Sequence, residues 1–313
     1  MLKRIQLIWN ILSILACIVI AIYAYPRIGG KLPAVPGNYQ KTTETGTTIE
    51  ETYMANGPHK VSLRKDALNQ VYKSYHIYYP SDISQNTNKL PVVVLSNGSG
   101  TPVSRYPAIA KHYASWGFIV IGTQEMFAWN GFASDMRIYH LHILDKTPVN
   151  SDGSNNVLYQ RIDWDNVGIV GHSQGGAGVI NAITRQTYKD TYKTAIALSP
   201  VNKDALYKFE WDYDATLIDI PILLIAGAGG GDDYVVTLEQ LEDIYDDISA
   251  PKAMARRKDT AHGEVLYMPD GYVTAWLMWQ LQADEEAAKA FIGDNPDILS
   301  NDLYQDIQFD LNP

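Results

Sequence analysis

A serine stands between two glycines in GHSQG, residues 171–175, with the spacing G-x-S-x-G. An apolar, β-branched run precedes it at 167–170 and a stretch with helical spacing follows, so this serine is expected where a strand turns into a helix. Such a turn strains the residue at its tip and requires small neighbours. The pattern predicts that Ser173 is a nucleophile and that the backbone amide of Gln174, at a helix N-terminus, stabilises an oxyanion. The alternative is a plain tight turn in which Ser173 caps the helix.

A serine hydroxyl attacks a carbonyl readily only when a base takes its proton, and a carboxylate must fix the tautomer of that base. His262 is the one histidine that follows Ser173 in the sequence. It lies in KDTAHGEV, which has the composition of a loop between a strand and the last helical segment. His262 is therefore a candidate for this base, with a surface loop histidine as the alternative.

From about Tyr53 onward, the order of these segments resembles the α/β-hydrolase family, in which the serine is followed by an acid and then by the histidine. The resemblance implies that the acid follows the strand IPILLIAG, where the sequence reads GGGDDYVVT. Asp233 is favoured because DYVVT matches the family pattern after this strand. Asp232 remains the alternative because the glycine run can shift the loop by one residue. Asp270 follows His262 and breaks the order.

The strand and glycine-containing loop VVVLSNGSG lie where such enzymes provide the second oxyanion amide. By this resemblance the backbone amide of Ser99 is the donor. Many relatives carry His-Gly where this chain has Asn97 and Gly98. The alternative is that NGSG is simply a good turn sequence.

Three segments give a finer resemblance to the cutinase-like, polyester-degrading and chlorophyllase-like branch of the family: VVVLSNGSG, LYQRIDWDNVGIVGHSQGG and YVTAWLMWQLQADEEAAKAF. This branch typically lacks a large lid, which implies esters with an accessible acyl group, at a lipid or polymer surface. QEMFAWNGF follows a parallel strand at the ligand-binding edge of such sheets. Its Met126, Phe127 and Trp129 are predicted to line an acyl pocket, with an ordinary place in the core as the alternative.

Apolar strands alternate with stretches of helical spacing along the chain, which predicts a mostly parallel sheet with helices on both faces. TIEETYM, HKVSLRK and YKSYHIYYP have strand-like composition and predict an antiparallel lead-in to that sheet. One long final helix is expected in GYVTAWLMWQLQADEEAAKAFIG. The predicted fold class is therefore α/β, with the α/β-hydrolase arrangement implied by the resemblance.

Two basic residues and an apolar run long enough to span a bilayer make up residues 1–25, which predicts one N-terminal transmembrane helix. The positive N-terminus favours a catalytic domain outside the cytoplasm. A cleaved signal peptide, which would give a secreted protein, and a lipoprotein cleavage at Cys17 are the alternatives. Residues 26–46 are rich in Pro, Gly and Thr and predict a linker, which leaves residues 47–313 as the hydrolase domain.

The composition excludes several other classes of protein. Of the 313 residues, 46% are hydrophobic, and the formal net charge of −10 is scattered, unlike the basic surface of a nucleic-acid binder. With Cys17 as the one cysteine, an intrachain disulfide or a cysteine metal cage is impossible. GAGGGD is no dinucleotide fingerprint because Asp232 would repel a pyrophosphate. SDGSNN, residues 151–156, lacks the ligand spacing of a calcium loop and predicts a surface turn.

Together these patterns predict a serine hydrolase that cleaves carboxylic esters through an acyl-enzyme, with no cofactor and no metal. The expected substrate is a small-molecule, lipid or polymeric ester, and the expected membrane contact is through the N-terminal segment. Two alternatives keep the same fold: an acyltransferase with the same triad, and a non-catalytic, membrane-anchored binding module.

Overall fold

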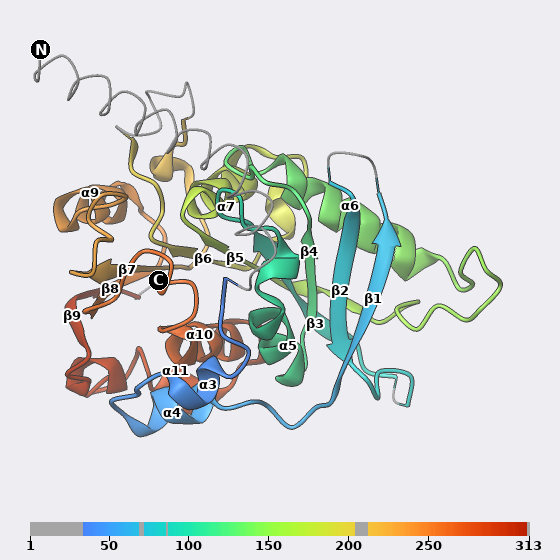
Figure 1. The fold of residues 1–313 in the computed structure, drawn as a ribbon, viewed down its shortest axis with the longest axis horizontal. Coiled ribbons are helices and arrows are strands. Elements are labelled where there is room, and N and C mark those ends of the chain that lie inside the picture. The colour runs from blue at the N-terminus through green and yellow to red at the C-terminus, as the bar shows by residue number, and fades with distance from the viewer. Residues whose placement is uncertain (1–33, 69–71, 86, 204–211, 312–313) are drawn as a thin grey trace, which may run out of the picture.

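The computed structural model describes residues 34–68, 72–85, 87–203 and 212–311. Their strands form one sheet in the order β1-β2-β4-β3-β5-β6-β7-β8-β9 (Figure 1). The strands β3 to β8 run parallel, whereas β1, β2 and β9 at the two ends of the sheet run antiparallel to their neighbours. The strands are β1 (Val61–Ala67), β2 (Ser74–Pro80), β3 (Leu90–Ser96), β4 (Ile119–Thr123), β5 (Ile162–His172), β6 (Thr194–Leu198), β7 (Ile222–Ala228), β8 (Lys252–Lys258) and β9 (Tyr304–Asp310).

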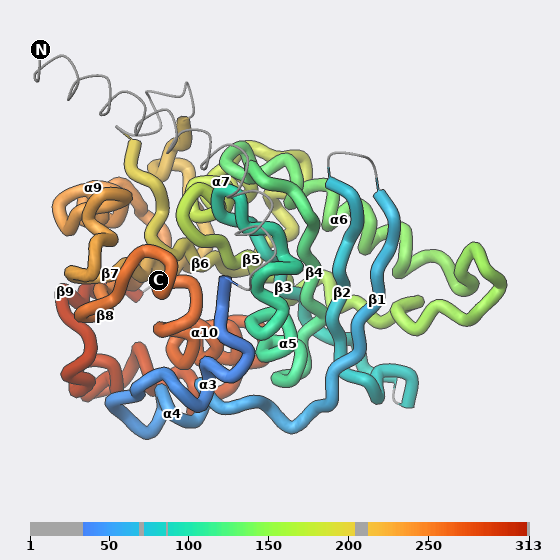
Figure 2. Tube along the Cα trace, in the orientation of Figure 1, coloured from blue at the N-terminus to red at the C-terminus, as the bar shows by residue number. Residues whose placement is uncertain are grey.

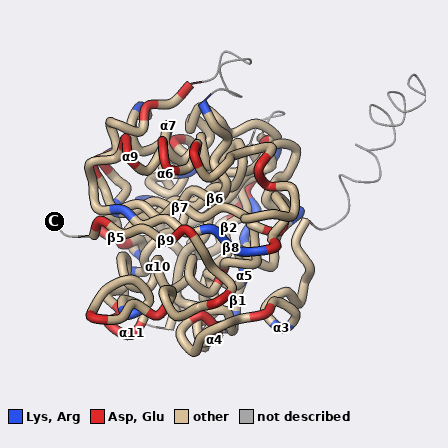
Figure 3. The backbone as a smooth tube through the Cα atoms, turned by 90° about the vertical axis from the view of Figure 1, so that its left-hand side faces the viewer, with Lys and Arg blue, Asp and Glu red and all other residues tan. Residues whose placement is uncertain are grey.

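Helices cover both faces of this sheet, as Figure 3 shows edge-on. Each face has its own apolar core, one under α6, α7 and α9 and the other under α5 and α10. The helices are α3 (Tyr39–Thr42), α4 (Thr48–Met54), α5 (Pro107–Ser115), α6 (Phe132–Lys146), α7 (Gln174–Arg185), α9 (Leu238–Asp247), α10 (Asp270–Gln282) and α11 (Glu285–Ala288), with the short 3-10 helices η3 (Val103–Arg105), η4 (Lys189–Thr191), η5 (Ala215–Leu217) and η6 (Asp297–Ser300).

Burial on both faces explains the composition of the central strands. Every residue of β4, β6 and β7 is buried, which matches their continuous apolar runs. The predicted α/β fold with a mostly parallel sheet is therefore confirmed. Because parallel strands all end at the same edge, the loops that follow β3, β4, β5, β7 and β8 come together there.

The segment TIEETYM is a helix, α4, and its prediction as a strand is wrong. Thr47 caps this helix by accepting a hydrogen bond from the amide of Glu50, and two acidic residues occupy the first turn. A capping threonine and early acidic residues favour a helix N-terminus over a strand. The antiparallel lead-in of the sheet consists of β1 and β2, as predicted for HKVSLRK and YKSYHIYYP.

The prediction of residues 26–46 as a linker is wrong for its described part. Val35 and Tyr39 are fully buried, and the Tyr39 hydroxyl donates a hydrogen bond to the carboxylate of Asp270 at the start of α10. The buried carboxylate of Glu50 accepts a hydrogen bond from the Tyr304 hydroxyl at 2.9 Å. The packed domain thus includes residues from 34 onward, and Figure 2 shows α3 and α4 beside α10.

The chain after β8 also differs from the prediction of one long helix. α10 ends at Gln282, its C-cap Ala283 has a left-handed φ of 55°, and Asp284 then caps the separate helix α11. The predicted transmembrane helix of residues 1–25 lies outside the described residues. Among the residues described, no helix has the length and apolar character needed to cross a membrane.

Candidate active site

Ser173 lies at the tip of the turn between β5 and α7, as the sequence predicts. Its φ of 61° and ψ of −124° are strained for a residue with a side chain. A Cβ atom added to Gly171 would lie 2.2 Å from the carbonyl oxygen of Gly175, and one added to Gly175 would lie 2.2 Å from that of Ser96. Both glycines are therefore required by close packing around the turn.

A chain of hydrogen bonds joins Ser173 to a histidine and a carboxylate. The Ser173 Oγ lies 2.8 Å from His262 Nε2, and His262 Nδ1 lies 2.6 Å from Asp232 Oδ1. With the proton on Nδ1, the hydroxyl donates to Nε2. The His262 side chain is 14% exposed and the Asp232 side chain is fully buried. Three loops, after β5, β7 and β8, thus bring these side chains together at the carboxyl edge of the sheet.

The prediction that Asp233 is the carboxylate beside the histidine is wrong. Its side chain is about half exposed and accepts a hydrogen bond from Arg256 Nη1 at 3.1 Å. The preceding glycines 229–231 all have positive φ, between 61° and 91°, and form a turn that directs the first aspartate, Asp232, inward. The alternative carboxylate named from the sequence is therefore the one in contact with His262.

The environment of Asp232 keeps it ionised. Burial alone would raise its pKa, but hydrogen bonds from His262, Ser199 and the Gly227 amide hold the pKa below its usual value. The Ser199 hydroxyl and the Gly227 amide contact Oδ2 at 2.7 and 2.6 Å, which leaves Oδ1 for the histidine. The carboxylate is thus fixed in position and in charge.

The loop after β3 packs against the serine. A Cβ atom added to Gly98 would lie 3.2 Å from the carbonyl oxygen of His172, which is closer than an ordinary contact, so the loop packs tightly against the serine turn. The amide of Gln174 is the first of α7, and among the described residues neither it nor the amide of Ser99 donates a hydrogen bond. Two unused backbone donors therefore lie on the loop and the helix that flank the nucleophile.

Asn97 holds this loop. Its side-chain amide donates to the carbonyl oxygens of Thr123 and Glu125, at 2.9 and 3.2 Å, and its oxygen accepts from the Tyr106 hydroxyl. Glu125 in turn forms a buried ion pair with Arg137 of α6. The polar network joins the end of β3 to the loop after β4.

The loop 124–131 carries the residues predicted to line an acyl pocket. Its carbonyls and amides bond to α7 and to the β3 loop: the Ala128 amide donates to Gln174 Oε1 at 2.8 Å, and the Gly100 amide donates to the Met126 oxygen at 3.0 Å. Met126 and Phe127 are 45% and 64% exposed, so the alternative of a place in the core is wrong for both. Trp129 is half-buried.

Two residues beside His262 were not identified from the sequence as part of the site. Tyr234, in the loop after β7, is exposed and its ring packs edge-on against the His262 imidazole, with 5.6 Å between centroids. His172 donates from Nε2 to the His262 carbonyl oxygen at 2.7 Å, and their rings lie 4.6 Å apart. The only sequence signal for His172 was its place inside GHSQG. It is in position to hold the loop that carries His262.

Buried histidines are expected to make the domain unstable in mild acid. Burial, with His262 nearby, lowers the pKa of His172 to about 3, and burial, with Lys65 nearby, lowers the pKa of His76 to about 4. Since unfolding lets both bind a proton below pH 6.5 or so, the free energy of unfolding should fall by up to about 1.4 kcal/mol per pH unit for each. Above that pH neither histidine contributes to the pH dependence of the free energy of unfolding.

Urea unfolding measured at pH 7 and pH 5 checks this expectation. In the variant His76→Gln, the free energy of unfolding should differ less between pH 7 and pH 5 than it does in the wild type. An equally steep dependence in the wild type and the variant would contradict it.

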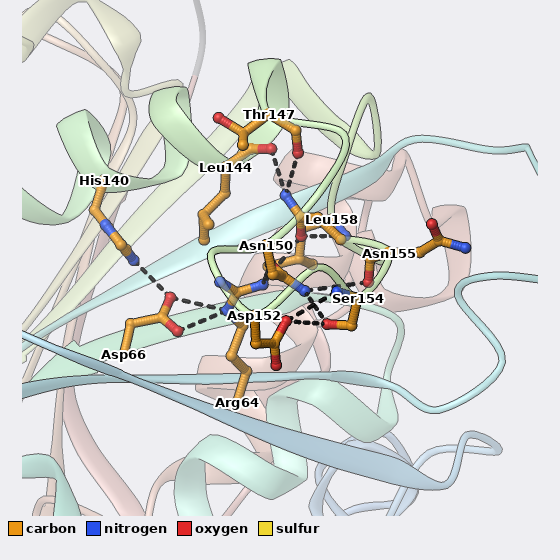
Figure 4. A network of polar contacts seen from close by, with 11 residues as sticks. Arg64, Asp66, His140, Leu144, Thr147, Asn150, Asp152, Ser154, Asn155 and Leu158 are labelled. Atoms are coloured by element: carbon orange, nitrogen blue, oxygen red, sulfur yellow. Dashed lines mark hydrogen bonds and ion pairs between the residues drawn. The ribbon is translucent and has the colours of Figure 1, made fainter.

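The segment 151–156 is a surface turn, as predicted. Asp152 accepts hydrogen bonds from the amide and hydroxyl of Ser154, and Asn150 bonds to Ser154 (Figure 4). Arg64 of β1 donates to Asn150, and its charge is paired with Asp66. Within the turn Asp152 and Ser154 satisfy each other, whereas Asn156 donates to the carbonyl oxygens of Leu144 and Thr147.

A comparison with known protein families gives a match over most of the chain. Residues 38–301 match a family model described as PET hydrolase-like. The match includes the serine turn and the loops that carry Asp232 and His262. A search of curated proteins finds none that matches the chain.

Proposed function

The chain belongs to the PET hydrolase-like family of α/β-hydrolases, and we propose that it cleaves carboxylic esters through an acyl-enzyme formed on Ser173. The observation that carries this proposal is the continuous hydrogen-bond chain from the Ser173 hydroxyl through His262 to buried Asp232. A strained serine, a histidine within reach of its proton and an ionised, immobile carboxylate are what nucleophilic attack on an ester requires.

In the first half of the reaction, the Ser173 oxygen attacks the carbonyl carbon while His262 Nε2 takes the hydroxyl proton. Asp232 holds the Nδ1 proton and stabilises the imidazolium that forms. The unused amides of Gln174 and Ser99 donate to the developing oxyanion. When the carbon–oxygen bond to the leaving alcohol breaks, His262 returns the proton to that alcohol.

In the second half, water attacks the acyl-enzyme with His262 as base, and the acid leaves as Ser173 is regenerated. No cofactor or metal takes part in this scheme. His172 acts as a positioning residue, because its hydrogen bond to the His262 carbonyl keeps the base over the serine. The exposed side chains of Met126 and Phe127 supply apolar contacts for the acyl group and favour esters presented at a surface.

The placement of the enzyme outside the cytoplasm, held by residues 1–25, is part of this proposal. Its support is the apolar sequence of that segment and the positive residues before it.

Labelling with a fluorophosphonate tests the nucleophile directly. The probe is expected to modify one serine, and mass spectrometry of the digested protein should place the adduct on the peptide that contains Ser173. Heat-unfolded protein serves as the control and should not be labelled, because the histidine no longer activates the hydroxyl. A folded protein that remains unlabelled would favour the non-catalytic binding module.

A further inference from the structure

Large apolar side chains are exposed around the candidate site. Met126 and Phe127 lie in the loop after β4, Phe132 is the first residue of α6, and Tyr234 lies in the loop after β7. They are 45%, 64%, 48% and 74% exposed, respectively. These four residues, here called the apolar rim, all lie on segments at the carboxyl edge of the sheet, where Ser173 is. An apolar patch around a reactive serine favours contact with an apolar surface.

The N-terminal segment enters the domain at this same edge. The amide of Ala34 donates to the carbonyl oxygen of Arg105 at 2.7 Å, and Arg105 Nη1 donates to the oxygen of Gly100 at 3.2 Å. Gly100 is bonded to Met126 of the apolar rim. Buried Val35 follows immediately and fixes this entry point. The first described residues are therefore two hydrogen bonds away from the loop that provides the Ser99 amide.

The spacing along the sequence limits how the domain can face a membrane. Eight residues, 26–33, separate Ala34 from the apolar run 5–25. Fully extended, they span at most about 28 Å. A domain of this size is roughly 45–50 Å across. Ala34 therefore cannot lie on the side of the domain that is turned away from a membrane containing residues 5–25. The carboxyl edge of the sheet, with the apolar rim, is the edge that stays near this membrane.

We propose that the carboxyl edge of the sheet faces the membrane that holds residues 5–25, and that the substrates are acyl esters of lipids in that membrane. This inference rests on the proposed function. The ester bonds of a lipid lie at the boundary between headgroups and acyl chains. Apolar side chains that enter the interface reach about 5–10 Å into that boundary. Insertion of the apolar rim thus places the edge of the sheet that carries Ser173 at this boundary.

A polarity-sensitive dye on the full chain tests the orientation. In a Cys17→Ser background, Phe127→Cys places the dye on the apolar rim. Leu217→Cys places it on η5, which leads into the opposite, amino end of β7 and is 52% exposed. In phosphatidylcholine vesicles, the dye at position 127 should shift to the blue and be quenched by brominated lipid, whereas the dye at 217 should report water. Equal signals at the two positions would overturn the orientation, as would recovery of a chain cleaved before residue 26.

Activity on two substrates tests the substrate class. The full chain in vesicles is given a fluorogenic diacylglycerol ester in the bilayer and, separately, soluble p-nitrophenyl acetate. Phe132→Ser should lower lipid-ester turnover, relative to acetate turnover, at least about fivefold, while the matched variant Leu217→Ser leaves the ratio unchanged. If the enzyme hydrolyses the acetate but not the lipid ester, this inference alone is overturned. The same holds if it hydrolyses a dispersed polyester faster than the lipid ester. Loss of both activities in the wild type would instead overturn the proposed function.

Discussion

Replacing Ser173 by alanine is expected to lower kcat for p-nitrophenyl ester hydrolysis by at least about 10⁴-fold, because the remaining groups have no nucleophile to activate. The turn itself should persist, since it is held by backbone bonds such as that from the Ser173 amide to the Leu198 oxygen at 2.8 Å. Initial rates for esters of graded acyl length measure the loss, and the profile of the wild type measures the acyl groups that the site accepts.

The matched control is Ser151→Ala, in the surface turn of residues 151–156. This variant should retain full activity, and thermal unfolding should show that both variants are folded. If Ser173→Ala kept more than a tenth of the wild-type rate, another nucleophile would be responsible and the acyl-enzyme on Ser173 would be wrong.

The adjacent aspartates provide the second large effect. Asp232→Asn should lower kcat by roughly 10³–10⁴-fold, because the amide no longer stabilises the protonated histidine or fixes its tautomer. Asp233→Asn should change kcat by less than about threefold, because that carboxylate faces Arg256 and solvent. Both substitutions remove one negative charge, from neighbouring positions. A difference in kcat between the two variants therefore cannot come from the change in net charge.

The comparison is made on soluble esters over pH 6 to 9, with folding checked by thermal unfolding. A large loss in Asp233→Asn together with a small one in Asp232→Asn would mean that the loop rearranges when substrate binds. In that case the hydrogen bond between His262 and Asp232 would not be the catalytic one.

The sequence by itself determined the parts of the protein that depend on short-range sterics. An apolar run that ends in G-x-S-x-G needs a strained turn, and the turn predicted around Ser173 is the one observed. Continuous apolar runs such as IPILLIAG need burial on both sides, which fixed a parallel sheet. His262 followed from the order of serine, acid and histidine that the family resemblance implies, since it is the only histidine after the serine.

Some elements were misread or missed because their conformation depends on distant partners. TIEETYM has a strand-like composition, but it packs as a helix against α10, and its Glu50 accepts hydrogen bonds from Tyr304 of β9 and from Asn301. β9 was not predicted, because its partner is β8, about 50 residues earlier in the chain. Residues 34–46 have the composition of a linker, yet a buried tyrosine and its bond to Asp270 hold them to the core.

The choice between two neighbouring aspartates was decided only by the tertiary structure. Asp232 and Asp233 have the same chemistry and differ by one place in the sequence, so spacing alone does not separate them. Positive φ angles in the preceding glycines, together with donors from Ser199 and Gly227, draw Asp232 into the protein, while Arg256 on β8 holds its neighbour outside. Gly227 lies on β7 just before the loop, but Ser199 follows β6 and Arg256 lies on β8, the two strands that flank β7 in the sheet. The direction of a side chain in a glycine-rich loop is set by such contacts, and they exist only once the sheet has formed.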